Sequence, residues 1–382
     1  MLKENPLKIV PSNLSINVQA SPSILKDLRH ALDLSFEEWE DWCSVNRLPR
    51  YISGQIINWI YKQGNLNPDT FSNLSKQIRQ LLVDSFLWSV MEVVSRLYSQ
   101  DESEKFLLKT ADNLLIEMVL MPSGKRTTLC ISSQVGCRMG CTFCQTGKMG
   151  FKRNLGSGEI LTQIHMANVY KKITNIVFMG MGEPLDNYDN VIKACKIMIA
   201  PKGYHLSTSK VTISTSGLVP EIYKLAQELP VRLAISLHQT DDIKRSKIMP
   251  INRKHNLQEL KESLLKYPAN SRYGITFEYV MIEGVNDSIA DAKKLVRFVH
   301  GLKAKVNLIP LNHFPGVDLQ ASTKKNLREF QLYLSERSIA APVRYSRGQD
   351  VSGGCGQLAA KKEEELHLSP REIQKKRQRE II

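Results

Sequence analysis

The run Cys137-Arg-Met-Gly-Cys141-Thr-Phe-Cys144 places three cysteines close together in a C-x3-C-x2-C pattern near the middle of the chain. Seven cysteines distributed at random over 382 residues would match this spacing in on the order of a few chains per thousand. Thiolates are soft ligands that select iron–sulfur clusters or zinc. Three thiolates leave one iron of a four-iron cube open, whereas zinc would need a fourth ligand, for which Cys130 is the candidate. The run therefore predicts a metal centre.

The residues around the three cysteines favour a cluster over zinc. Gly136 and Gly140 let the backbone wrap closely around a bulky group, and the aromatic Phe143 precedes the last cysteine. Together with the segment GMGEP at 180–184, the run resembles the signature of the radical S-adenosylmethionine (SAM) superfamily. The resemblance implies a [4Fe–4S] cluster on the three cysteines. Its open iron would bind the amino and carboxylate groups of SAM and supply the electron that cleaves SAM to a 5′-deoxyadenosyl radical.

Around this run, β-like segments alternate with helical ones. The predicted strands lie at 127–131, 175–179, 211–214, 231–236, 275–279 and 305–309, and helices follow the last five at 189–199, 220–228, 257–266, 288–300 and 324–335. Such alternation is typical of parallel α/β architecture, and about six units predict a partial (βα)6 TIM-like barrel. Active sites of such barrels lie at the C-terminal ends of the strands. Polar residues there are candidates, although each alone is also compatible with a capping or turn role: Glu183, Ser214, Ser236, His238 and Asn312.

The rest of the chain divides around this core. We expect a loose polar arm at 1–22, a small, mainly helical domain at 23–100, a β-rich linker at 101–126, the core at 127–350, a cysteine loop at 351–358 and a charged tail at 359–382. Ile56, Trp59 and Ile60 share one face at helical spacing, which is typical of simple core packing. The tail mixes charges of both signs and is typical of a solvated segment, although its basic residues are also compatible with phosphate contacts.

Composition narrows the class of protein further. The net charge of +14 favours a polyanionic partner, most commonly nucleic acid, and is equally compatible with a solvated basic surface. No apolar run approaches the roughly 18 residues of a membrane helix, and the N-terminus lacks the apolar region of a secretory signal. We therefore expect a cytoplasmic protein without membrane contact, and we take a monomer as the default. The cysteines are odd in number and clustered, unlike a secreted disulfide framework, and Cys43 and Cys195 match no motif and are expected to be structural.

Further segments carry a more specific resemblance. They lie between residues 45 and 360 and are TLCISSQVGC (128–137), FKRNL (151–155), GMGEPL (180–185), STSG (214–217), SLH (236–238), MPIN (249–252) and GCGQL (354–358). This set is similar to the core of the RlmN/Cfr family of radical SAM RNA methyltransferases. Departures from the usual family pattern leave the RNA target open; they are Gln145, Gln239-Thr240, His313 and Ser352-Gly353-Gly354.

The resemblance implies methylation of an adenosine ring carbon: C2 in 23S ribosomal RNA and in some cases tRNA, or C8 in Cfr-type members. These carbons are not nucleophilic, so they cannot take the methyl group of SAM directly. The resemblance makes Cys355 the methyl carrier, loaded by one SAM before a second SAM supplies the radical. It also implies that Cys130 forms a transient disulfide with Cys355, which releases the methylated base, and that Glu117 removes the proton from the ring carbon. The C2 type is our main hypothesis. The alternatives are a C8-type or other-target RNA methyltransferase and a zinc-bearing RNA-binding module without catalysis.

The same resemblance assigns the SAM contacts to Gly182, Glu183, Ser214, Ser236, Leu237, His238 and Asn312. By itself His238 is compatible with an ordinary core histidine, but its place beside Ser236 at a strand end favours the site. The helical N-terminal region resembles the accessory RNA-binding domain of the family, in line with the basic charge. The chemistry needs an electron donor such as a flavodoxin or ferredoxin, and the target base must leave its stack.

Overall fold

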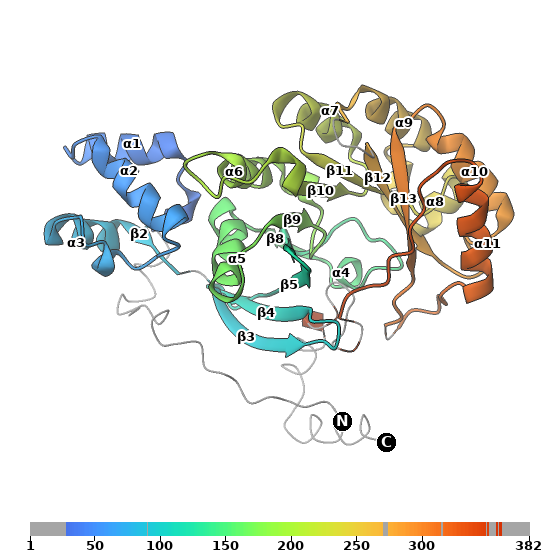
Figure 1. The fold of residues 1–382 in the computed structure, drawn as a ribbon, viewed down its shortest axis with the longest axis horizontal. Coiled ribbons are helices and arrows are strands. Elements are labelled where there is room, and N and C mark those ends of the chain that lie inside the picture. The colour runs from blue at the N-terminus through green and yellow to red at the C-terminus, as the bar shows by residue number, and fades with distance from the viewer. Residues whose placement is uncertain are drawn as a thin grey trace, which may run out of the picture.

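A computed structural model describes residues 28–89, 91–269, 274–314, 316–348, 350, 357 and 359–360 (Figure 1). A small helical module at the N-terminal end lies beside a larger α/β unit (Figure 1). Cys355, the predicted methyl carrier, lies outside the described residues. Within the described ranges, every helix is too short or too polar to span a bilayer.

The helical module is built around aromatic side chains. Its elements are β1 (Arg29–His30), α1 (Phe36–Val45), α2 (Tyr51–Ile57), α3 (Lys76–Ser85) and β2 (Phe86–Leu87). Ser35 begins α1 with a capping box, in which Ser35 and Glu38 each accept the backbone N–H of the other. Trp39 is fully buried at the centre of the module, with its ring 5.0 Å from that of Phe86. This aromatic packing joins the two ends of the module.

The α/β unit is organised by a nine-stranded sheet of order β13-β12-β11-β10-β9-β6-β5-β4-β3. Its strands are β3 (Met91–Tyr98), β4 (Glu104–Thr110), β5 (Leu115–Ser123), β6 (Arg126–Cys130), β9 (Asn175–Phe178), β10 (Val211–Thr215), β11 (Arg232–Ser236), β12 (Ile275–Met281) and β13 (Ala304–Pro310). The six strands β6 and β9 to β13 pair in parallel, which confirms the predicted partial barrel. β3 to β5 extend it as antiparallel strands. The sheet thus begins inside the region that we expected to be helical.

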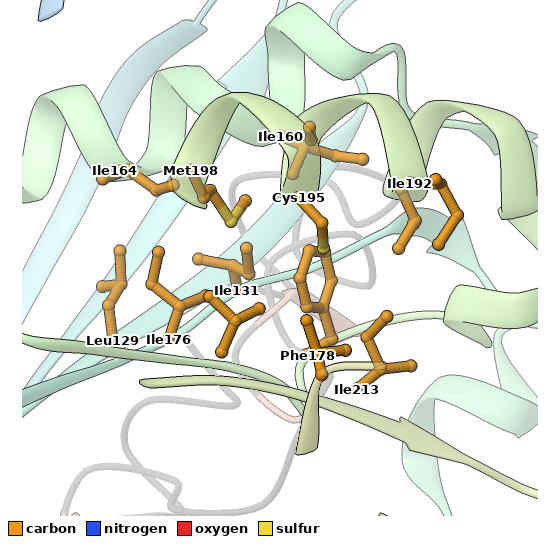
Figure 2. Packing of buried hydrophobic residues seen from close by; sticks show 14 of the residues in the cluster. Leu129, Ile131, Ile160, Ile164, Ile176, Phe178, Ile192, Cys195, Met198 and Ile213 are labelled. Atoms are coloured by element: carbon orange, nitrogen blue, oxygen red, sulfur yellow. The ribbon is translucent and has the colours of Figure 1, made fainter. Parts of the chain in front are cut away.

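Helices cover the outer face of the sheet (Figure 1). They are α5 (Ser157–Tyr170), α6 (Tyr188–Ile199), α7 (Val219–Glu228), α9 (Leu257–Lys266), α10 (Ile289–Val299) and α11 (Lys324–Ser335). Figure 2 shows apolar side chains of α5 and α6 meeting those of β6, β9 and β10, with Ile164, Cys195 and Met198 on the helix side and Leu129 and Phe178 on the sheet side. Each side chain of this kind contributes about 1.5–3 kcal/mol when fully buried.

Polar contacts and close packing anchor the helical module to α5. The Asp33 Oδ1 accepts hydrogen bonds from Ser157 Oγ at 2.8 Å and from Gly158 N–H at 2.6 Å. The carboxylate thereby satisfies a backbone N–H that the first turn of a helix leaves unpaired. His30 packs so closely that a Cβ on Gly158 would lie 2.1 Å from its Nδ1. The module and the barrel therefore meet through a tightly packed interface.

Candidate active site

The three clustered cysteines lie on a loop between the short strand β7 (Gln134–Gly136) and the short helix α4 (Gln145–Lys148). Strand β7 pairs with β8 (Phe151–Asn154), and Cys137 N–H donates to Gly150 O at 2.9 Å. The φ of Gly136 is 73°, and a Cβ there would lie 1.8 Å from Gly150 O. Only glycine therefore fits the point where the loop leaves the hairpin.

The three thiols share one partly buried environment. Burial raises the pKa of Cys137 to about 12 and also raises the pKa of Cys144. Burial raises the pKa of Cys141 too, and the charges of the other two cysteines add to that rise. The thiols therefore lie within electrostatic reach of one another, and each would lose its proton only to a strongly bound metal centre.

This donor set fits an iron–sulfur cube better than a single ion. In the part of the chain that the structure describes, no three His, Cys, Asp or Glu side chains converge closely enough to bind one metal ion. A four-iron cube holds each thiolate on a separate iron, so its cysteines need not converge on one point. Three soft sulfur donors on one close-turned loop match that requirement.

Glu183 connects the cluster loop to the end of β10. It is 4% exposed, and its carboxylate accepts Ser216 N–H at 2.7 Å and Leu185 N–H at 3.1 Å. Its own N–H donates to Gln134 Oε1 at 2.9 Å, beside the cluster loop. Burial raises the pKa of Glu183 despite these hydrogen bonds. The predicted residue therefore lies at the strand ends, next to Gly182 and within electrostatic reach of Cys141.

The other predicted SAM residues also lie at or near strand ends. Ser214 and Ser236 are on β10 and β11, and Asn312 is two residues beyond β13. His238 follows the buried Leu237; its φ is 55°, and its Nδ1 accepts Val280 N–H at 2.9 Å. Burial lowers the pKa of His238 to about 3, so the ring is neutral and Nε2 carries its proton.

An aromatic contact places His238 beside the cluster loop. The ring of Phe143 meets that of His238 edge-on, with 4.6 Å between the centroids. A cavity of about 550 Å³ opens at the same loop, lined by residues that include Cys141 and Lys148. The aromatic contact thus joins the cysteine loop to the segment that follows β11, and the cavity borders the same loop.

Arg245 is a site residue that the sequence does not single out. It lies on the short helix α8 (Asp242–Ile248) and is 1% exposed. Its guanidinium donates to the carbonyls of Ser216, Ser236 and Leu237 at 2.8, 3.0 and 3.0 Å, and to Asn252 Oδ1 at 2.8 Å. Burial lowers its pKa to about 10. The side chain holds together the loops that follow β10 and β11. Its run DDIKRSK is typical of a solvated helix, and no signal in the sequence distinguishes this arginine from its charged neighbours.

Glu117 and Cys130 lie on the paired strands β5 and β6. Cys130 lies directly across from Val119 in the β5–β6 pair, so it faces the same side of the sheet as Glu117. The Glu117 carboxylate is 3.0 Å from Lys105 Nζ, and both side chains are almost fully buried. Burial raises the pKa of Cys130 to about 12, and the charge of Glu117 contributes to the rise.

The Glu117 carboxylate also contacts the C-terminal segment. Its Oε1 accepts Ala359 N–H at 2.8 Å, and Ala359 is fully buried. The charge of Glu117 reaches Cys144 as well, where it adds to the pKa rise caused by burial. The structure therefore brings Glu117 within electrostatic reach of both Cys130 and the cluster-loop residue Cys144.

Comparisons with known proteins agree with this geometry. The model of the radical SAM superfamily matches residues 131–298. The dual-specificity RNA methyltransferase RlmN of Geotalea uraniireducens is 44% identical over 85% of this chain and 95% of its own length. The protein of the same name from Nitratiruptor sp. is 41% identical over 87% of this chain and 98% of its own. The crystal structure of a radical SAM methyltransferase from Sphaerobacter thermophilus superposes with a TM-score of 0.82 at 40% identity, covering 86% of this chain and 98% of that one.

A partial barrel whose strand ends carry a three-thiol loop and a buried carboxylate is the architecture of a radical SAM enzyme, and the superfamily match spans that loop and the strands β9 to β12. The class implies a [4Fe–4S] cluster and SAM, which the residues described above would hold. The relatives cover most of the chain at more than 40% identity. The chain belongs to the RlmN family.

Proposed function

We propose that this protein methylates an adenosine ring carbon in RNA, with C2 as the position and 23S ribosomal RNA and tRNA as the substrates. The relatives are named as RNA methyltransferases, which supports an RNA substrate, and a net charge of +14 suits a polyanion. The observation that carries the proposal is the hydrogen bond from Ala359 N–H to Glu117. Ala359 follows Cys355 by four residues, which span at most about 14 Å. The contact therefore supports a second cysteine within reach of Cys130.

In this proposal Cys355 carries the methyl group and Cys130 releases the product. When bound, the cluster and two successive SAM molecules supply the methyl group and the carbon radical. Once the carrier carbon has joined the base, the sulfur of Cys130 attacks that of Cys355. The S–S bond forms, the S–C bond breaks, and the carbon keeps the bonding pair and takes up a proton to become a methyl group. Before that attack, the base adduct gives up its unpaired electron, which the bound cluster would accept, and Glu117 removes the proton from the ring carbon.

The protonation state of the Cys130 thiol suits a disulfide-forming step that must wait for the substrate. With a pKa near 12, this thiol keeps its proton at neutral pH, and a protonated thiol is a poor nucleophile. The neighbouring Glu117 is a proton acceptor on the same side of the sheet. An idle enzyme is thereby protected from premature disulfide formation.

Mass mapping of treated RNA tests the proposal. Cluster-loaded enzyme, SAM and a chemical reductant are incubated with 23S ribosomal RNA or tRNA, and we expect 2-methyladenosine. The Cys130→Ala variant should instead accumulate RNA attached through Cys355. The matched control is Cys195→Ala, since Cys195 lies in the hydrophobic core, and it should release product. Free methylated RNA from Cys130→Ala at the normal rate would contradict the role of Cys130. If only 8-methyladenosine forms, the methylated position is C8 and not C2. If neither methyladenosine forms, the proposal of RNA methylation is refuted.

Iron analysis separates the enzyme from a zinc-bearing binding module. After anaerobic reconstitution we expect a brown protein with about four irons per chain, and a colourless zinc protein would contradict the proposal. We further expect a monomer that takes its electrons from a low-potential donor of the flavodoxin or ferredoxin type. Sedimentation and reduction kinetics of the reconstituted protein check these two expectations.

A further inference from the structure

The inner face of the barrel carries a row of polar side chains across β11, β12 and β13. Ser236, Glu278 and Asn307 are direct partners in the register of these strands. On β12 the flanking residues face the outer helices, since the ring of Phe277 is 5.7 Å from that of Phe298 and the ring of Tyr279 is 5.4 Å from that of Phe330. Side chains alternate along a strand. The Glu278 side chain therefore faces the barrel interior.

Glu278 and Asn307 form a buried pair with an unused acceptor. Each is 8% exposed, and Asn307 Nδ2 donates to Glu278 Oε1 at 2.9 Å. A carboxylate only accepts hydrogen bonds, so it orients the amide with the NH2 group toward itself and Oδ1 away. Among the described residues, Asn307 Oδ1 is buried and has no hydrogen-bond partner. A buried acceptor of this kind costs free energy unless a ligand supplies a donor.

The pair lies at the level of the predicted cofactor residues. The Glu278 carbonyl accepts Leu237 N–H at 3.0 Å, at the point where β11 ends. Burial raises the pKa of Glu278 to about 7, against the opposing effects of Asn307, Lys305 and Arg344. Two neighbouring hydroxyl donors would satisfy the carboxylate and the free amide oxygen together. The surroundings thus favour a neutral ligand group with two adjacent donors.

We propose that Glu278 and Asn307 recognise the ribose hydroxyls of SAM. A vicinal diol offers two O–H donors side by side, which matches two neighbouring acceptors, and carboxylates bind ribose hydroxyls in other nucleotide sites. In this class the amino and carboxylate groups of SAM bind the open iron. The ribose of SAM is therefore the part that can contact the strand ends. The inference rests on the SAM chemistry of the class and is independent of the RNA target.

Binding of deoxyribose analogues tests the assignment. Equilibrium dialysis of cluster-loaded enzyme under anaerobic conditions compares SAM with its 2′-deoxy and 3′-deoxy analogues. The unmodified enzyme should bind at least one analogue about tenfold to a hundredfold more weakly, the loss expected for a hydrogen bond to a charged group. Glu278→Gln should bind SAM more weakly by a similar factor and lose the preference for SAM over that analogue. Thr276→Val, two residues earlier on β12, is the matched control and should behave like the unmodified enzyme.

A second variant keeps the test decisive if Glu278→Gln does not fold. Asn307→Ser leaves the carboxylate in place and removes the amide oxygen, so it should also reduce the preference for SAM over a deoxy analogue. Iron content and circular dichroism report whether each variant is intact. An intact variant that keeps the original affinity and the original preference overturns the assignment. Because no RNA is present, this result stands apart from success or failure of RNA methylation.

Discussion

Arg245→Met should destabilise the strand ends of the barrel more than any surface change. The guanidinium donates four hydrogen bonds, to Ser216, Ser236, Leu237 and Asn252. A buried acceptor left unpaired costs about 1–3 kcal/mol, so four acceptors lose about 8 kcal/mol at a mid-range value. Against this, the pKa of Arg245 is lowered from 12.5 to about 10, so removing the buried charge recovers about 3 kcal/mol. Local relaxation reduces the difference further, and we expect a net loss of about 3–5 kcal/mol.

Urea unfolding of the cluster-loaded protein under anaerobic conditions measures this loss. Hydrogen exchange gives the location, because faster exchange should be confined to the loops after β10 and β11. Lys247→Met is the matched control: Lys247 is exposed, on the same helix as Arg245, and its change should stay within about 0.5 kcal/mol. If Arg245→Met costs less than about 1 kcal/mol, or no more than the control, the guanidinium does not hold these loops together.

Two further predictions concern the remainder of the fold. Gly158→Ala should destabilise the protein by about 1–3 kcal/mol through overpacking, since the new Cβ would lie 2.1 Å from His30. Gly54→Ala is the matched control: no atom lies within 4 Å of its Cβ position, so it should stabilise the protein by up to about 1 kcal/mol. Equal melting temperatures of the two variants in calorimetry would refute the contact with His30. Burial lowers the pKa of His165 from 6.5 to about 4, so the unfolded chain binds a proton between these values that the native protein does not. Stability should therefore fall as pH drops from 6.5 to 4, by up to about 3 kcal/mol from this residue, and His165→Gln should flatten the curve over that window.

The sequence was sufficient to predict the barrel. The parallel strands were readable because their apolar runs are short, β-branched and separated by helical segments. The segment MEVVSRLY at 91–98 lies in the region predicted to be helical, but it forms β3. Its apolar residues alternate imperfectly, and a bulge between Val93 and Ser95 interrupts its register. Pairing with β4 decides its structure, and such non-local pairing is not encoded in local periodicity.

The sequence does not predict which side chains contact one another when they lie on distant segments. Glu117 was singled out by resemblance, but its buried contact with Lys105 depends on the alignment of two antiparallel strands. Arg245 is one of several charged residues on its helix, and only the packing of α8 against two loops buries it. Glu278 lies in an apolar strand, where a lone acid suggests no particular role. Each of these depends on distances between segments far apart along the chain.

The anchoring of the helical module to α5 has a geometric consequence for substrate choice. Asp33 and His30 fix the module against the first turn of a helix that packs on the barrel. If the module binds RNA, the distance between the bound RNA segment and the cysteine loop is then fixed by the protein. A substrate would be selected by whether its reactive adenosine falls at that distance, so two RNAs without common sequence could both qualify. The interface would set the distance at which an adenosine can react, so weakening the contacts of Asp33 and His30 with α5 should broaden the range of adenosines that are modified.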